Sequence, residues 1–375
     1  MMPATTLPRL LHRNAASVGG RPAFREKRRG IWQVLTWSQY ASLVARFAAG
    51  LAANGFGRGD RLAVIGDNRP QLYAALLAAQ SLGGAGVPLM PDADPEAIAR
   101  IVADAEVSVV VAEDAELAET IVAMRDRLAT LRLIVQAGSQ DMHHSESGLL
   151  KPFDSVTGPA VTDRSESGDV ALILYAEEAP RMMTHRSMLA TADAMIAAHD
   201  IRRTDETLAW LPMAWSGDVL SSLAMGLTAG FTCNCPERPA TSRGDLREIG
   251  PTILIAPPRV WETMLTEIEA RAAQASRMKR ALFARFAAIG ERAELRRTAG
   301  EEVPAPLRLK LMVGELLIHA PMRDQLGLRH LRWAGTGGEA LAPHVLRRLH
   351  AFGINLDGDH SVSEPTHAAG EPLHA

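Results

Sequence analysis

The segment Val107-Ser-Val-Val-Val-Ala112 decides the fold class. Its apolar run lacks the alternation of a half-exposed strand and is typical of a strand that is covered on both faces in a parallel sheet. A helix-like stretch comes before it and begins at Asp94-Pro95-Glu96, with proline in its favoured place in the first turn. Strands that alternate with helices in this way predict an α/β protein with layered, mainly parallel sheets flanked by helices.

The same alternation continues on both sides of this segment. Strands are expected at 61–65, 85–90, 131–135, 169–175, 206–211, 231–235, 252–256 and 330–334. Helices are expected from near residue 70, at 184–199, at 276–297 and at 343–352. A polar stretch rich in Ser, Asp, Gly and Pro, residues 138–168, interrupts the series. The sequence therefore predicts one α/β subdomain over residues 1–168, ending in this connector, and a second over residues 169–375.

Composition excludes several classes of protein. Hydrophobic residues make up 47% and charged residues 22% of the chain, the ordinary balance of a globular protein. A net charge of −3 and 5% aromatic residues argue against nucleic-acid binding. The two cysteines, Cys233 and Cys235, are expected to be reduced thiols of a cytoplasmic protein. The apolar segment from Leu72 to Met90 is broken by two glycines, so it predicts a buried helix, a turn and a buried strand instead of a transmembrane span.

The expected helix over residues 276–297 allows two interpretations. It is basic, and Leu282, Phe283, Phe286 and Ile289 are interleaved among its arginines and lysines. Cationic amphipathic helices bind membrane surfaces. A surface helix that packs its apolar side on the core has the same pattern. Membrane contact and homo-oligomerisation both stay open at this point.

A glycine-rich turn, Gly335-Thr-Gly-Gly-Glu-Ala340, lies between a strand and a helix. It is therefore placed at the carboxyl end of a strand, where open α/β sheets bind ligands. An ordinary connection between a strand and a helix is the alternative.

Taken together, these segments resemble the large N-terminal domain of the long-chain acyl-CoA synthetases, which are AMP-forming enzymes of the adenylate-forming superfamily. The resemblance covers the chain from about Leu7 to Thr366. The stretches that carry it are Ala63-Val-Ile-Gly-Asp-Asn-Arg-Pro70, Asp245-Leu-Arg-Glu-Ile-Gly-Pro251, Ala256-Pro-Pro-Arg-Val-Trp261 and 333–355.

The resemblance implies a reaction and its cofactors. The family uses ATP and Mg²⁺ to convert a fatty acid to an acyl-adenylate and then transfers the acyl group to coenzyme A. By resemblance, the substrate is a fatty acid or another carboxylic acid. Charge develops on phosphate oxygens in the first step, so hydrogen-bond donors and the metal ion must already be in place.

Several positions match functional residues of the family, and their roles are implied by that match. Gly338, Glu339 and Ala340 correspond to the turn that lines the adenine pocket, and His360 stands where the nucleotide-binding motif has tyrosine. Ser363 replaces a threonine, and Glu364 matches the glutamate that helps to hold Mg²⁺. Leu211-Pro-Met-Ala-Trp215 resembles the segment beside the acyl tunnel, so Trp215 is expected either to contact the fatty chain or to be a core residue.

The phosphate-binding loop departs from the family pattern. The family has a loop of roughly Y-T-S-G-T-T-G-x-P-K-G, whereas this chain has Tyr175-Ala-Glu-Glu-Ala-Pro-Arg-Met-Met-Thr-His185. Glycine allows close backbone approach and hydroxyl groups donate to phosphate, and most of them are lost here. The degenerate loop keeps Arg181 as a cation and Thr184 as a hydroxyl, while Ala176, Glu177 and Glu178 replace the cradle.

The chain stops at Ala375, so by resemblance we expect the small C-terminal domain to be absent from it. Three hypotheses follow. The first is an ATP-dependent fatty acid–CoA ligase with impaired catalysis. The second is a non-catalytic pseudoenzyme that binds an acyl chain, a nucleotide or a protein partner. The third is a truncated product without a selected role.

Overall fold

The computed structural model describes residues 5–138, 149–175, 179–337 and 341–361. The chain forms two compact units, Met1–Asp245 and Leu246–Ala375. This division lies further along the chain than the boundary at 168/169 that the sequence suggested. The strand that follows the polar connector joins the sheet built by the first half, and this pairing ties residues 169–184 to unit 1. A separate subdomain over residues 1–168 stays a prediction.

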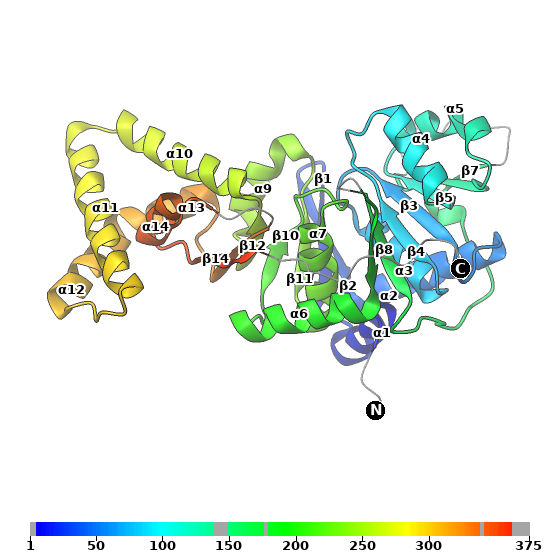
Figure 1. The fold of residues 1–375 in the computed structure, drawn as a ribbon, viewed down its shortest axis with the longest axis horizontal. Coiled ribbons are helices and arrows are strands. Elements are labelled where there is room, and N and C mark those ends of the chain that lie inside the picture. The colour runs from blue at the N-terminus through cyan, green and yellow to red at the C-terminus, as the bar shows by residue number, and fades with distance from the viewer. Residues whose placement is uncertain (1–4, 139–148, 176–178, 338–340, 362–375) are drawn as a thin grey trace. The chain divides into compact units, whose positions relative to one another are not determined.

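A seven-stranded sheet forms one layer of unit 1 (Figure 1). In sheet order its strands are β7 (Leu150–Pro152), β6 (Leu133–Gln136), β5 (Val107–Ala112), β3 (Arg61–Ile65), β4 (Ala85–Pro88), β8 (Val170–Leu174) and β9 (Arg181–Thr184). Neighbouring strands are parallel except β8 and β9, which are antiparallel. Every residue of β5 is buried, as its unbroken apolar run predicts. The predicted α/β class with mainly parallel sheets is confirmed.

Some helices of unit 1 pack directly on this sheet, and others pack on those helices. Those of the first half are α1 (Leu7–Val18), α2 (Trp37–Ala53), α3 (Pro70–Ser81), α4 (Pro95–Asp104) and α5 (Ala115–Ala123), with single turns η1 (Arg125–Arg127) and η2 (Phe153–Ser155). The apolar sides of α4 and α5 pack on β3 to β6 in one hydrophobic cluster. Asp94 caps α4 by accepting a hydrogen bond from the Ala97 backbone at 2.7 Å, with proline at the first helical position.

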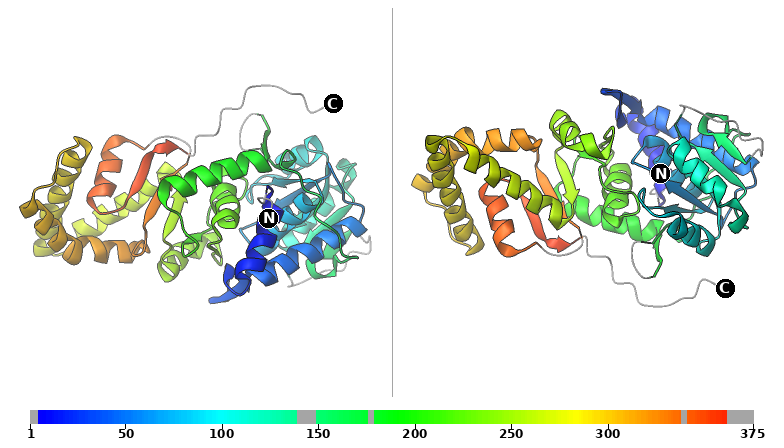
Figure 2. Two further views of the ribbon diagram at one scale, coloured as in Figure 1. Left: turned by 90° about the horizontal axis from the view of Figure 1, so that it is seen from below. Right: turned by 90° about the horizontal axis from the view of Figure 1, so that it is seen from above.

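A second, four-stranded sheet of unit 1 has the order β10 (Glu206–Leu208), β11 (Thr232–Cys235), β1 (Pro22–Arg28) and β2 (Ile31–Thr36). The strands β10, β11 and β1 are parallel, and β2 closes a hairpin on β1. Its associated helices are α6 (His185–His199), α7 (Ser216–Asp218), the π-helical η3 (Val219–Met225), α8 (Gly226–Ala229), η4 (Pro239–Thr241) and α9 (Ser242–Ile249). Figure 2 shows these elements from two further directions.

Helix α3 is buried along its whole length. It packs on β3 and β4, and its Tyr73 ring lies 5.5 Å from the ring of Phe24 on β1, measured between centroids. The apolar segment from Leu72 to Met90 is therefore a buried helix followed by the buried strand β4, as predicted. Within the described residues no helix is both long enough and apolar enough to span a bilayer.

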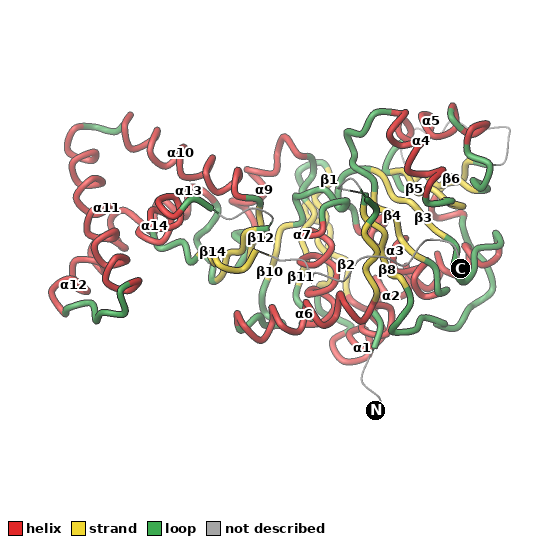
Figure 3. The backbone as a smooth tube through the Cα atoms, viewed as in Figure 1, coloured by secondary structure: helices red, strands yellow, loops and turns green. Residues whose placement is uncertain are grey.

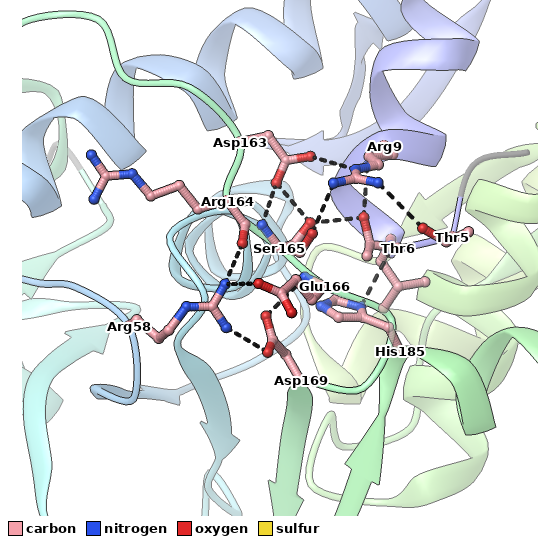
Figure 4. Close-up of polar contacts among 11 residues, drawn as sticks. Thr5, Thr6, Arg9, Arg58, Asp163, Arg164, Ser165, Glu166, Asp169 and His185 are labelled. Carbon is pink, nitrogen blue, oxygen red and sulfur yellow. Dashed lines mark hydrogen bonds and ion pairs between the residues drawn. The ribbon is translucent and has the colours of Figure 1, made fainter. Parts of the chain in front are cut away.

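The end of the polar connector is fixed by a hydrogen-bond network (Figure 4). The Ser165 hydroxyl lies 2.8 Å from that of Thr6, and Arg9 donates to the Ser165 carbonyl at 3.0 Å. Arg58 forms an ion pair with Asp169 at 2.6 Å. The end of the connector is thus bonded to residues at the start of helix α1 and to the loop before β3.

Unit 2 contains a parallel three-stranded sheet in the order β12 (Ile253–Ala256), β13 (Trp333–Thr336) and β14 (Leu356–Ser361). Its helices, red in Figure 3, are α10 (Pro258–Gln274), α11 (Arg277–Thr298), α12 (Ala305–Gly314), the π-helical η5 (Glu315–His319), α13 (Ala320–Leu326) and α14 (Pro343–Ala351). In α11, Phe286 is buried and the Phe283 ring lies 5.4 Å from that of Phe352. Some apolar residues of this basic helix therefore pack within unit 2, whereas Met278 and Leu295 are 79% and 56% exposed.

Candidate functional site

The carboxyl ends of β3, β4, β5 and β8 lie on one edge of the seven-stranded sheet, because these strands are parallel. This edge is where open α/β sheets bind ligands. The turn after β3 begins at Gly66, whose φ of 137° is in the region that favours glycine, and a Cβ there would lie 2.3 Å from that of Glu113. Gly66 thus lets the turn approach the segment after β5 closely.

The predicted phosphate loop starts at this edge, since it follows β8. Ala176, Glu177 and Glu178 lie outside the described residues. Before them, the Tyr175 hydroxyl donates to Asp104 at 2.6 Å, and burial together with this bond raises the pKa of Tyr175. After them, Arg181 is the first residue of β9 and pairs with Leu174, so residues 175–180 connect the two strands.

Thr184 ends β9 and caps α6. Its hydroxyl accepts a hydrogen bond from the Ser187 backbone N–H at 3.1 Å, and the Ser187 hydroxyl accepts one from the Thr184 N–H at 3.0 Å. The Thr184 oxygen thus stabilises the first turn of a helix. The phosphate-binding role predicted for this residue stays a prediction.

His185 follows directly and is fully buried. Its Nδ1 accepts a hydrogen bond from the Leu7 backbone at 3.3 Å, which joins α6 to the start of α1 (Figure 4). Burial lowers the pKa of His185 to about 4, so its ring is neutral at pH 7. In this state the ring nitrogen can accept, and the residue connects two elements of the fold.

A buried carboxylate lies near the predicted acyl segment. Asp218 is 1% exposed and accepts hydrogen bonds from the Tyr73 hydroxyl at 2.6 Å, the Ser222 hydroxyl at 3.0 Å and the Asn68 amide at 3.2 Å. The Asn68 amide also donates to the Leu211 carbonyl at 2.7 Å. Burial raises the pKa of Asp218 to about 7 despite these three donors. We call Asp218, Tyr73, Asn68 and Ser222 the Asp218 network.

The Asp218 network fixes the segment that carries Trp215. Trp215 precedes α7 and is half-buried, and its ring lies against Gly217, where a Cβ would come 2.0 Å from the ring. Beside this segment a cleft of about 220 Å³ is lined by the turn after β3 and by the segment after β10, including Asn68, Trp210 and Leu211. Contact of Trp215 with an acyl chain stays a prediction.

A larger cleft of about 400 Å³ is lined by charged residues at the ends of β1, β5 and β11 and by uncharged residues at the end of β6. Arg69 crosses it: the guanidinium forms an ion pair with Glu113 at 2.7 Å and donates to the carbonyls of Pro236 and Glu237 at 2.8 and 2.7 Å. Lys27 is paired with Asp245 at 2.8 Å. Because these cations have partners within the protein, the contacts explain cohesion of the two sheets and do not by themselves indicate an anion site.

In unit 2 the predicted adenine turn follows β13. Gly338, Glu339 and Ala340 lie outside the described residues, as do Ser363 and Glu364. His360 lies within β14, but its side chain is not described. The strand before the turn is fixed by Trp261, whose indole N–H donates to the Gly335 carbonyl at 3.2 Å. Thr336 is fully buried at the strand end, and its hydroxyl has no hydrogen-bond partner among the described residues.

Over the residues that the structure describes, no group of three or more His, Cys, Asp or Glu side chains is arranged to hold a metal ion. The Mg²⁺ role predicted for Glu364 falls on a residue outside that part of the chain and stays a prediction.

Sequence reasoning missed the Asp218 network and the charged cleft. Asn68 and Arg69 belong to a segment that was matched to a family signature. Asp218, the partner of Asn68, lies 150 residues further along the chain. The partners of Arg69 lie in two other segments, at Glu113 and at Pro236. The only signal in the sequence is an aspartate placed just before an apolar run, at Asp218, and this pattern is common in exposed helix starts.

Comparison with known proteins adds a family and a fold. The profile of the AMP-binding enzyme family matches residues 11–359. The chain is 24% identical over 382 residues to the rat long-chain-fatty-acid–CoA ligase ACSBG2, covering 96% of this chain and 56% of that protein. It is 23% identical to human ACSBG1, with 96% and 53% covered. The chain therefore spans about half the length of these curated relatives.

Solved structures share the fold. The adenylation domain of a carboxylate reductase from Mycobacterium chelonae superposes with a TM-score of 0.71 at 16% identity, covering 94% of this chain and 57% of that one. A long-chain-fatty-acid-CoA ligase from Archaeoglobus fulgidus superposes with a TM-score of 0.67 at 15% identity, covering 92% and 60%.

Proposed function

The chain belongs to the AMP-binding enzyme family, and from that premise we propose that it is a fatty acid–CoA ligase-type domain with impaired use of ATP. The substrates would be a fatty acid or another carboxylic acid, with ATP, Mg²⁺ and coenzyme A as the family's co-reactants. The relatives named long-chain-fatty-acid–CoA ligases support the substrate class.

One observation carries the proposal of impairment, namely the residues between β8 and β9. Glu177 and Glu178 stand where the family has glycine and hydroxyl residues. A carboxylate within a few ångströms of a phosphate costs about 1 to 4 kcal/mol at the dielectric of a protein surface. Arg181 supplies one compensating cation, but a side-chain charge does not replace the backbone and hydroxyl donors of a phosphate cradle. The residues present therefore do not fit a triphosphate.

A second candidate is a pseudoenzyme that binds an acyl chain or nucleotide without reacting it. The Asp218 network favours it, because a buried, fully hydrogen-bonded group beside Trp215 keeps the predicted acyl segment in one conformation. Titration calorimetry with AMP and with palmitate tests this candidate. Binding of either without turnover supports it, and binding of neither contradicts it.

Pyrophosphate release in the presence of ATP, Mg²⁺ and palmitate tests the main proposal. We expect little release from the 375-residue chain. The double variant E177Q/E178Q removes charge and leaves the loop length unchanged, and a second variant places a glycine, serine and threonine loop at 176–180. Release by the second variant alone would identify the missing cradle as the defect, whereas release by both would identify the charge. Rapid release by the unaltered chain would refute the proposed impairment.

A further inference from the structure

A row of exposed apolar side chains runs along α12 and η5. Leu309, Met312, Val313, Leu316 and Leu317, which we call the α12 stripe, are between 42% (Val313) and 75% (Leu316) exposed. Their spacing of three, one, three and one residues places them on one side of a helix. The opposite side of the helix is used for packing, since Gly314 is buried and approaches Phe286 of α11. The helix thus has a packed side and an apolar side that no other described part of the chain covers.

Such a stripe is unusual for a surface that stays in water. Single exposed apolar residues are ordinary, whereas contiguous apolar patches mark binding surfaces. Neither the Asp218 network nor the cleft at Arg69 involves these residues, so the proposed function does not explain them.

The charge around the stripe selects the partner. The segment 277–319, which comprises α11, α12 and η5, contains nine lysines and arginines against five glutamates, although the whole chain has a net charge of −3. Arg308 and Lys310 are exposed and directly flank Leu309. On α11, Arg296 and Arg297 are also exposed and form surface ion pairs with Glu301 at 3.4 Å and Glu294 at 3.5 Å, so the unbalanced charge comes mainly from the other cations. A basic surface with an apolar stripe complements an anionic bilayer, into whose headgroup region the apolar side chains enter while cations contact the lipid phosphates.

A second copy of this chain is the competing occupant. Two identical stripes in contact would bring two positively charged segments together, and this repulsion is unfavourable. We therefore propose that the α12 stripe and its flanking cations form a surface that binds anionic lipid bilayers in the plane of the interface. This inference is independent of whether the chain uses ATP.

Vesicle co-sedimentation of the 375-residue chain tests the proposal. Vesicles of phosphatidylcholine alone are compared with vesicles that also contain phosphatidylglycerol, at low and at raised salt. We expect binding to the anionic vesicles, weakened by salt. The triple variant L309Q/M312Q/L316Q is expected to lower the partition coefficient at least tenfold, which corresponds to about 1.4 kcal/mol.

The chain offers a matched control. Ile31 and Val34 on β2 are 63% and 52% exposed, so I31Q/V34Q changes exposed apolar residues away from the stripe and should leave binding unchanged. The charge variant R308Q/K310Q should weaken binding to anionic vesicles and reduce its salt dependence. Far-UV circular dichroism verifies that all variants fold.

Three outcomes would overturn the proposal. They are failure of the folded chain to bind anionic vesicles, equal binding by the triple variant, and equal loss in the I31Q/V34Q control. Analytical ultracentrifugation supplies a fourth: a lipid-free dimer that L309Q/M312Q/L316Q dissociates would assign the stripe to a second copy.

Discussion

The Asp218 network makes a quantitative prediction about pH. The pKa of Asp218 is about 7 in the folded protein, against about 4 for an aspartate in an unfolded chain. Between these values the folded state binds more protons than the unfolded state, so the contribution of this group to stability falls as pH rises. A difference of about 3 units corresponds to about 4 kcal/mol between pH 4 and pH 7. Taken by itself, Asp218 therefore favours the folded state on the acidic side of this range.

The variant D218N removes the titration and keeps a side chain of the same size. We expect the free energy of local unfolding of D218N not to decrease between pH 4 and pH 7. The difference in this free energy between wild type and variant should therefore change by about 4 kcal/mol across the range. Hydrogen exchange of peptides covering residues 216–225 measures that free energy at each pH, after correction for intrinsic exchange rates. This local measurement does not require the two units to unfold together.

A second variant distinguishes titration of Asp218 from a general effect of acid. The Tyr73 hydroxyl donates to Asp218 and lowers its pKa relative to burial alone. Y73F should therefore raise the pKa further and extend the fall in stability to higher pH. If D218N had the same pH dependence as wild type in these peptides, the assignment of the buried proton to Asp218 would be wrong.

Three further predictions concern the frame of unit 1. The pKa of His185 is lowered to about 4, so this residue contributes to stability above pH 6.5 and that contribution, about 3 kcal/mol, is lost as pH falls to 4. In urea unfolding, the variant H185N should lack this loss of stability at acidic pH. R69M should destabilise unit 1 by about 3 to 5 kcal/mol, because it leaves the carboxylate of Glu113 without its ion pair, and an unchanged urea midpoint would contradict this. G50A should cost about 1 to 3 kcal/mol, since a Cβ at Gly50 would lie 2.3 Å from the carbonyl oxygen of Val156, and thermal denaturation beside the exposed control G20A measures it.

Sequence pattern predicted the positions of several strands well. The runs 61–65 and 107–112 are strands at the expected bounds, because continuous apolar β-branched residues need cover on both faces. The expected strand at 330–334 instead spans Trp333–Thr336, since its start was inferred from polar residues with no period. The hairpin of β1 and β2 and the helix α12 were missed. The hairpin has a mixed polar and apolar composition that gives no clear strand pattern. For α12, the sequence does not distinguish an apolar stripe that is exposed from one that is packed.

The candidate site was predictable only where family resemblance supplied a motif. Thr184 shows what the sequence does not reveal. Its position beside the predicted phosphate loop can be read from the sequence, but its role as the cap of α6 depends on the contact with Ser187 in the structure. Asp218 illustrates a second limit, since two of its three donors, Tyr73 and Asn68, are 145 and 150 residues away in the sequence and meet it only in the folded chain. Long-range contacts of this kind have no local signal.

The two cysteines have a practical consequence for measuring the kinetics of this protein. Both lie on β11 in unit 1 and are at most 1% exposed, and unit 2 contains no cysteine. Burial raises the pKa of Cys235, so the reactive thiolate is suppressed as well as shielded. A thiol-specific alkylating reagent should therefore modify the native chain only when the four-stranded sheet opens. Mass spectrometry of alkylated protein would then time that opening without any engineered label.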